Sequence, residues 1–294
     1  NTGSSLERIV LNENVQGVSG AWFMYGFSNL TEVLGPERVD LKFHNGCIYN
    51  SDYSKLIYWP SAKPYSEDGL KCNDDGECMV KEFGVRAFSN HKYLSSFVVP
   101  RSVTKLGEWV FYKTPIKSLS IHSNVTEMGK YCFAYSSELA TITLETAHVS
   151  EENLFSYCGK LTNVEILADL TSIPDSMFAV CSSLRVVNIP GTVTSIGAFA
   201  FSNSGLTEIV IPENVKTIGS NCFLGCTYLG SIDVLPTTAP SLGSDAFGNA
   251  DKNYTGSEAV IKTMHVPQGS TGYESGDWAS ILQNKVGFTL YKDL

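Results

Sequence analysis

The sequence predicts a solenoid of short parallel β coils, and three observations lead to this prediction. Phenylalanine recurs every 22 to 24 residues along most of the chain. A pair of apolar residues separated by one position, often followed by proline, recurs in the same register. A second apolar pair ending in glycine precedes most of these phenylalanines. Self-similarity at one fixed period is the signature of stacked repeats, so the fold class is a repeat array.

The phenylalanines set the register of the repeat. The intervals between them are 23, 22, 22, 23, 23, 22 and 24 residues, and the residues are Phe88, Phe111, Phe133, Phe155, Phe178, Phe201, Phe223 and Phe247. Apolar triplets keep the same offsets, as in Leu184-Val187-Ile189, Leu206-Ile209-Ile211 and Leu229-Ile232-Val234. The unit is therefore L-x-x-I-x-I-P-x-x-V-x-x-I-G-x-x-A-F-x-x-C-x-x-L.

Each part of the unit predicts one element of a coil. The I-x-I step alternates with period two, which is typical of a strand with one buried face, and proline ends it. We expect parallel strands at about 95–99, 117–121, 140–144, 162–166, 185–189, 207–211 and 230–234. The V-x-x-I-G step is a second extended piece whose glycine permits a tight corner. The segment around each phenylalanine has helical spacing, enough for one helical or 3₁₀ turn. The phenylalanine column should fill the interior.

This unit resembles the leucine-rich repeats of bacterial BspA-like surface proteins, which are related to treponemal leucine-rich repeats. The stretches 184–201 and 206–223 carry the resemblance most clearly, and it covers about residues 77–250. The resemblance implies a right-handed leucine-rich repeat solenoid, mostly β, with a cap at each end. It also implies a protein that attaches to host matrix or plasma proteins, or to other cells.

The remaining segments complete a single solenoid domain over 1–294. A looser repeat predicts an N-terminal coil and cap at 8–36, where the aromatic cluster 22–27 is either part of the cap or a ligand patch. Alternating apolar runs on both sides of 50–55 predict an inserted β-hairpin at 40–64. The main repeats occupy 77–250, and 251–294 resembles the terminal cap of the same family.

Composition limits the classes of function. Hydrophobic residues make up 43% and charged residues 17%, which is typical of a folded chain. A net charge of −9 argues against a nucleic-acid partner, because phosphate backbones attract basic surfaces. No apolar run reaches the roughly 18 residues of a membrane span. The start Asn1-Thr2-Gly3 fits a processed chain whose signal peptide has been removed, so we expect an extracellular or cell-surface protein.

The motifs of common catalytic sites are missing from the sequence. The five histidines are scattered, and no H-E-x-x-H, G-x-S-x-G, Walker or Rossmann pattern occurs. His122 takes the slot that holds proline in other coils, which we interpret as an exposed variant. We therefore expect no enzyme activity, no cofactor and no metal site. An enzyme with its site at the inserted hairpin is the less favoured hypothesis.

Seven of the eight cysteines fall into two groups. Five occupy column slots that other coils fill with alanine, serine or threonine, and they should be buried packing groups: Cys132, Cys158, Cys181, Cys222 and Cys226. Cys72 and Cys78 instead enclose a loop of turn-forming residues, where a disulfide could close a hairpin. Free thiols or a calcium loop are the alternatives for this pair, although the spacing of a calcium loop is missing.

We expect the binding surface on the outward side of the I-x-I strands, because alternation sends the intervening residues outward. The later coils gather acidic, amide and apolar side chains there, namely Glu165, Asn188, Glu208, Val210, Ser231 and Asp233. An acidic patch with exposed valine suits a basic protein partner. The first hypothesis is a non-catalytic protein that mediates protein–protein binding or adhesion. The alternative is a carbohydrate-associated module, for which the outward strand positions lack the expected Trp or Tyr.

Overall fold

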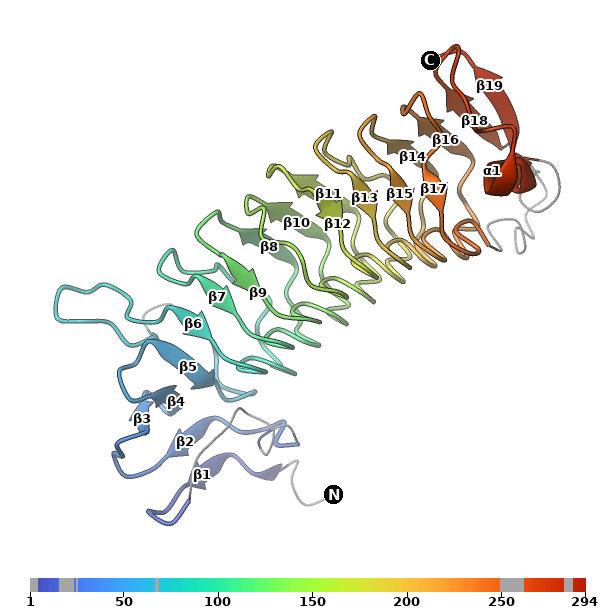
Figure 1. Ribbon diagram of the computed structural model, residues 1–294. Helices are drawn as coiled ribbons and strands as arrows, with labels where there is room; N and C mark the ends of the chain where they lie inside the picture. The colour runs from blue at the N-terminus through green and yellow to red at the C-terminus, as the bar shows by residue number, and fades with distance from the viewer. Residues whose placement is uncertain (1–4, 16–23, 25, 67–68, 249–261, 283–287) are drawn as a thin grey trace.

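A computed structural model describes residues 5–15, 24, 26–66, 69–248, 262–282 and 288–294. The chain winds into an elongated solenoid in which strands stack side by side from the N-terminal to the C-terminal end (Figure 1). Almost all regular structure is β, with one short helix among the described residues. The predicted fold class is confirmed.

One long side of the solenoid consists of the I-x-I strands, which pair in parallel. Each of these strands has four residues, and the second and fourth of them are turned inward. They are β8 (Ser118–Ile121), β10 (Thr141–Leu144), β11 (Asn163–Ile166), β14 (Glu208–Ile211), β16 (Ser231–Val234), β18 (Thr263–Val266) and β19 (Thr289–Lys292). We call the outward side of these strands the strand face.

The predicted strands at 95–99 and 185–189 are wrong, because neither run pairs as a strand. Burial nevertheless alternates there as expected: Val98 is exposed while Val99 is buried. The N–H of Thr207 still donates to the carbonyl of Arg185 at 2.9 Å, but the ladder does not continue. Alternation records which side chains are buried, and burial fixes their direction without requiring adjacent backbones to reach ladder distance.

A second side of the solenoid consists of the V-x-x-I-G steps, which form two-residue parallel strands. The glycine in these steps allows close packing of coils. A Cβ at Gly129 or at Gly219 would lie 2.4 Å from a backbone nitrogen of the preceding coil. We call this side the short-strand face; its strands are β6 (Glu82–Phe83), β7 (Lys105–Leu106), β9 (Glu127–Met128), β12 (Ser172–Ile173), β13 (Ser195–Ile196), β15 (Thr217–Ile218) and β17 (Ser241–Leu242).

The third side, the turn edge, surrounds each column phenylalanine. The N–H of Ala87 donates to the carbonyl of Gly84, and the N–H of Ser89 donates to the carbonyl of Arg86. These are separate turns rather than a 3₁₀ helix, because Arg86 has a left-handed φ of 60°. The N–H of Phe88 donates onward to Val110 of the next coil at 2.9 Å. Residues two before and two after the phenylalanines adopt left-handed backbone with φ between 52° and 71°: Arg86, Asn90, Trp109, Lys113, Tyr131, Tyr135, Asn153, Tyr157, Ser176, Val180, Phe199, Asn203, Asn221, Gly225 and Asp245.

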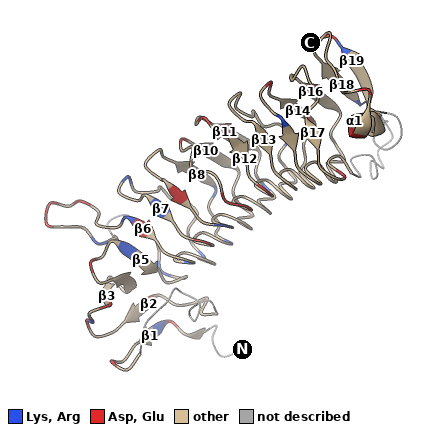
Figure 2. Cartoon of the chain, viewed as in Figure 1, with Lys and Arg blue, Asp and Glu red and all other residues tan. Residues whose placement is uncertain are grey.

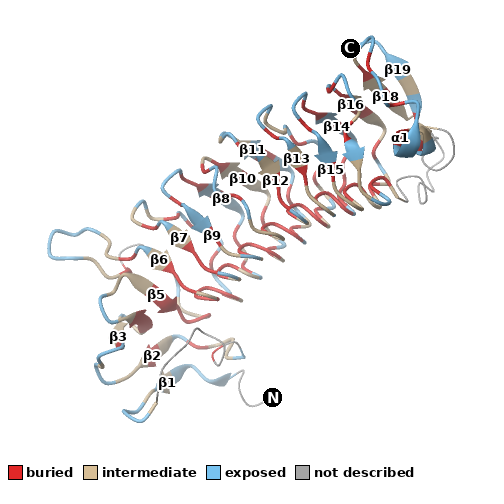
Figure 3. Ribbon diagram, viewed as in Figure 1, coloured by how far each residue is buried: buried red, intermediate tan, exposed pale blue. Residues whose placement is uncertain are grey.

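The column phenylalanines stack into one spine, as the register predicted. All eight are at most 2% exposed. Adjacent rings lie 4.9 to 5.9 Å apart between centroids and are nearly parallel. The buried residues run as continuous bands through the array (Figure 3). Each ring therefore belongs to the contact between two coils, and the core is a column along the solenoid.

The N-terminal end combines one parallel coil with an antiparallel meander. Strands β1 (Arg8–Val10) and β2 (Glu32–Leu34) pair in parallel. Strands β3 (Leu41–His44), β4 (Cys47–Asn50) and β5 (Lys55–Tyr58) pair antiparallel in sequence. Strand β5 also pairs in parallel with β6, so the meander forms the N-terminal end of the sheet on the short-strand face. Of the aromatic cluster at 22–27, residues 22, 23 and 25 lie outside the described residues.

The C-terminal end closes the spine with aromatic residues. Helix α1 (Gly276–Ser280) places Trp278 against Phe247, with 6.0 Å between ring centroids. The indole N–H of Trp278 donates to the carbonyl of Pro240, and the hydroxyl of Tyr273 donates to Pro236 at 2.7 Å. These bonds satisfy the polar atoms of two buried rings.

Candidate binding surface

Strand pairing brings four of the predicted binding residues together on the strand face. In the pairing of β14 with β16, Glu208 lies opposite Ser231 and Val210 lies opposite Asp233. Glu208 and Val210 are exposed, whereas Ser231 and Asp233 are half-buried. Residues opposite each other on parallel strands present their side chains on one face of the sheet. A carboxylate, a valine and a second carboxylate thus share a small area.

The other two predicted residues lie further along the same side. Glu165 is exposed on β11 and accepts a hydrogen bond from the hydroxyl of Thr143 at 3.2 Å. Asn188 is exposed on the coil between β11 and β14, in the run that forms no strand. Strands β11 and β14 belong to different sheets, so Glu165 has no register partner in the β14–β16 cluster.

The strand face continues beyond the predicted residues onto β18 and β19. Asp233 lies opposite His265, and His265 lies opposite Tyr291. The imidazole and phenol rings stack with centroids 5.0 Å apart, and His265 Nδ1 lies 2.8 Å from an oxygen of Asp293. A sequence signal for β18 existed, because Met264-His265-Val266-Pro267 matches the I-x-I-P step.

The strand face also exposes apolar side chains. Val186 is 41% and Val210 is 44% exposed. Nearby in the register, the guanidinium of Arg185 lies 5.2 Å from the ring centroid of Tyr228, and it also donates to the carbonyl of Gly205 at 2.7 Å. This part of the face offers apolar contact area beside carboxylates, which is the mixture found at protein interfaces.

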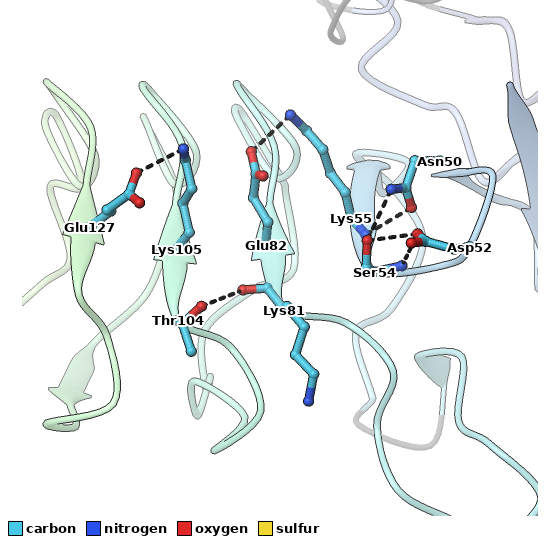
Figure 4. A network of polar contacts seen from close by, with 9 residues as sticks. All are labelled: Asn50, Asp52, Ser54, Lys55, Lys81, Glu82, Thr104, Lys105 and Glu127. Atoms are coloured by element: carbon cyan, nitrogen blue, oxygen red, sulfur yellow. Dashed lines mark hydrogen bonds and ion pairs between the residues drawn. The ribbon is translucent and has the colours of Figure 1, made fainter.

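The short-strand face differs because its charges pair with one another. Lys55, Glu82, Lys105 and Glu127 occupy one register row on adjacent strands (Figure 4). The ion pairs Lys55–Glu82 and Lys105–Glu127 have N···O distances of 2.8 and 2.7 Å. Blue and red therefore alternate from β5 to β9 (Figure 2). The row continues with neutral residues, Ser172, Ser195, Thr217 and Ser241.

The column cysteines are fully buried, which confirms the predicted location. The cysteines located three positions after a spine phenylalanine also have polar contacts that the sequence did not predict. The thiol of Cys181 lies 3.3 Å from the carbonyl oxygen of Phe155, and the hydroxyl of Ser136 donates to the carbonyl oxygen of Phe111 at 3.1 Å. In these coils the slot supplies a donor to the previous coil, whereas the hydroxyl of Thr114 donates to the carbonyl of Phe111 in its own coil at 2.9 Å. Burial raises the pKa of all five column thiols.

Cys72 and Cys78 lie opposite each other in an antiparallel bridge. The N–H of Asn73 donates to Glu77 and that of Met79 donates to Lys71, both at 2.9 Å, so the cysteines form a non-hydrogen-bonded pair. Such pairs hold their Cα atoms about 4.5 Å apart, within the range that a disulfide spans. The disulfide between them stays a prediction.

His122 is buried, so its interpretation as an exposed variant was wrong. It is 4% exposed, and Nε2 lies 3.1 Å from the carbonyl oxygen of Pro100 on the preceding coil. Pro212 is also buried in the equivalent slot. Pro100 and Pro190 are half-buried in the same slot, so it accepts either a proline or a histidine ring.

No metal-binding cluster is present in the part of the chain that the structure describes: His, Cys, Asp and Glu side chains nowhere gather in threes. Within the same residues, no helix has the length and apolar character needed to cross a bilayer.

The stacked parallel coils, with an apolar column from each position of the repeat, define a leucine-rich repeat solenoid. The family model described as BspA type leucine rich repeat region matches residues 77–151 and 148–262, in six copies. The chain belongs to this family. No curated protein is significantly similar to the sequence.

Two solved bacterial structures resemble the chain. A leucine-rich repeat protein from Eubacterium ventriosum is 25% identical with a TM-score of 0.64, over 76% of this chain and 59% of that chain. A leucine-rich repeat protein from Bacteroides ovatus is 24% identical with a TM-score of 0.58, over 88% of this chain and 63% of that chain. This chain therefore spans about three fifths of the length of either protein.

Proposed function

We propose that this chain is a non-catalytic binding module, secreted or displayed at a cell surface, that adheres to a host or cell-surface protein through the strand face. A leucine-rich repeat solenoid presents a long ordered surface, which suits the recognition of proteins. The resemblance to BspA-like surface proteins supports the location and the type of partner. The observation that carries the proposal is the cluster of Glu208, Val210 and Asp233 on adjacent strands.

The carboxylates of this cluster are available to a partner. Glu208 and Asp233 take part in no ion pair among the described residues, whereas the charges on β5 to β9 neutralise one another. A partner with lysine or arginine around a small apolar group would complement the cluster. Attraction between exposed charges steers association and weakens as salt rises, because the Debye length falls to about 8 Å at physiological ionic strength.

The experiment combines capture with charge reversal. Immobilised protein is incubated with serum and matrix proteins, captured proteins are identified by mass spectrometry, and their association rates are measured at several salt concentrations. The double variant Glu208→Lys with Asp233→Lys should slow association of the captured partner by at least about tenfold at low salt. Folding should be preserved, because neither side chain enters the core.

A matched control carries the same change in charge on the same side of the solenoid. Asp169 follows β11 and Glu213 follows β14, and both are exposed just beyond their strands. Asp169→Lys with Glu213→Lys should therefore leave most of the association rate intact. Equal affinity and equal salt dependence of the first double variant and wild type would show that the strand face is not the binding surface.

A further inference from the structure

The turn edge of three consecutive coils carries five aromatic side chains in mutual contact, which we call the aromatic ladder. Trp109 stacks on Tyr131, and Tyr135 stacks on Tyr157, each with centroids 4.2 Å apart. Tyr112 joins the two stacks, at 4.9 Å from Trp109 and 5.2 Å from Tyr135. The ladder lies on a different side of the solenoid from the strand face.

Four of the five rings occupy backbone positions that disfavour them. Trp109, Tyr131, Tyr135 and Tyr157 have φ between 56° and 61°, the left-handed region that bulky residues avoid. Equivalent slots in other coils hold Asn or Gly, which adopt this conformation readily, as well as Arg86, Ser176, Val180 and Phe199, which do so less readily. The ladder is distinguished by the contact among its rings and by its partial exposure, because Tyr157 is 44% exposed and the other four rings are half-buried. Strained residues gathered in one place that solvent reaches point to a use for their side chains.

Each stacked pair covers one face of both rings, and the guanidinium of Arg86 lies 4.6 Å from the ring centroid of Trp109. Ring edges carry partial positive charge, and Lys113 adds an ammonium group 5.4 Å from the ring centroid of Tyr112 and 5.7 Å from that of Tyr135. This arrangement favours an anion.

A shallow groove runs beside the ladder, lined in part by Asn90, Lys92, Lys113, Tyr135, Ser137 and Glu138. The carboxylate of Glu138 is held by Lys160, at 2.7 and 2.8 Å. Lys92 and Lys113 form no ion pair among the described residues, although Lys92 donates a hydrogen bond to Asn29. The groove is therefore locally positive in a chain whose net charge is −9.

We propose that the aromatic ladder and this groove bind an acidic polysaccharide, with its carboxylates against Lys92 and Lys113 and its hydroxyl groups against the phenols. The polar groups in the lining, such as the amide of Asn90, the hydroxyl of Ser137 and the ammonium of Lys113, can bond to sugar hydroxyls, and Pro115 and Tyr135 add apolar area beside them. It lacks the desolvated pocket in which a peptide side chain anchors a protein interface. This surface does not depend on the strand face, so the two proposals fail separately.

The test measures binding of oligogalacturonate to the full chain by isothermal titration calorimetry at several salt concentrations. Neutral galactan and an oligoglutamate peptide are the comparison probes. The variant Tyr135→Asn with Tyr157→Asn removes two rings while placing a favoured residue in each left-handed slot. Phe199→Asn is the matched control, because Phe199 occupies a left-handed slot on the same edge and is 41% exposed outside the ladder.

We expect oligogalacturonate to bind wild type and to weaken with salt. Affinity should fall at least about tenfold, or about 1.4 kcal/mol, in Tyr135→Asn with Tyr157→Asn and in Lys113→Glu. Phe199→Asn and the strand-face variant Glu208→Lys with Asp233→Lys should bind like wild type. The proposal is overturned by lack of binding, by unchanged affinity in the ladder variants, by equal binding of neutral galactan, or by tighter binding of oligoglutamate, which would indicate an acidic protein partner.

Discussion

Replacing Phe178 by alanine tests whether the phenylalanine spine holds the coils together. Its ring is fully buried and lies between Phe155, at 5.9 Å, and Phe201, at 5.7 Å between centroids. The coils on both sides are fixed by backbone bonds, such as Phe178 N–H to Ala200 at 2.8 Å, so they cannot close over the lost volume. The free energy of unfolding should therefore fall by roughly 3–5 kcal/mol, the range for a buried phenylalanine truncated in a core that cannot collapse.

Urea unfolding followed by circular dichroism measures this loss. Phe199→Ala is the matched control, because Phe199 is 41% exposed and only two positions from the spine. Its free energy of unfolding should fall by much less than that of Phe178→Ala, because part of the Phe199 ring is already in water and its removal opens no enclosed cavity. Losses of equal size in the two variants would contradict the view that the spine, rather than apolar content in general, stabilises the array.

Three further predictions concern His91, the column cysteines and the pair Cys72 and Cys78. Burial lowers the pKa of His91 to about 4, and Nδ1 accepts the N–H of Tyr93 while Nε2 contacts the carbonyl of Lys63 at 2.7 Å. As pH falls from 6.5 towards 4, histidine in the unfolded chain binds a proton while His91 in the folded chain stays neutral. The free energy of unfolding should therefore drop by up to about 3 kcal/mol in that window, and by much less in His91→Gln. Urea unfolding midpoints at several pH values measure this drop. The five column cysteines should react with iodoacetamide only after unfolding, and labelling in the native state would contradict their burial. Cys72 and Cys78 should resist labelling in unfolded protein until a reductant is added, and mass spectrometry reads both results.

The parts of the fold that could be predicted are those in which the same residue type recurs in every coil. The phenylalanine column and the I-x-I step could be aligned across coils, and their burial follows directly from stacking. Hydrogen bonding was harder to predict, because the runs at 95–99 and 185–189 alternate like strands without pairing. Alternation reports burial, whereas pairing depends on the approach of two backbones.

Other features depend on positions whose residue types vary. The slots two residues before and after each spine phenylalanine hold Asn, Gly, Tyr, Trp and other types, so their shared left-handed backbone is visible only where Asn153, Asn203 or Gly225 hints at it. The contact between rings such as Tyr112 and Tyr135 depends on these slots and therefore could not be predicted from the sequence. The strand-face residues could be predicted because alternation fixes their direction, but the extension to His265 and Tyr291 lies beyond the regular period.

Carboxylate footprinting of the captured complex tests the central claim that the strand face is the binding surface. Free protein and complex are labelled with a carbodiimide and an amine, and the modification of each Asp and Glu is measured by mass spectrometry. We expect partner binding to protect Glu165, Glu208 and Asp233 from modification, while Asp169 and Glu213 keep most of their reactivity. Unchanged labelling of the first three residues, with protection elsewhere on the solenoid, would contradict it.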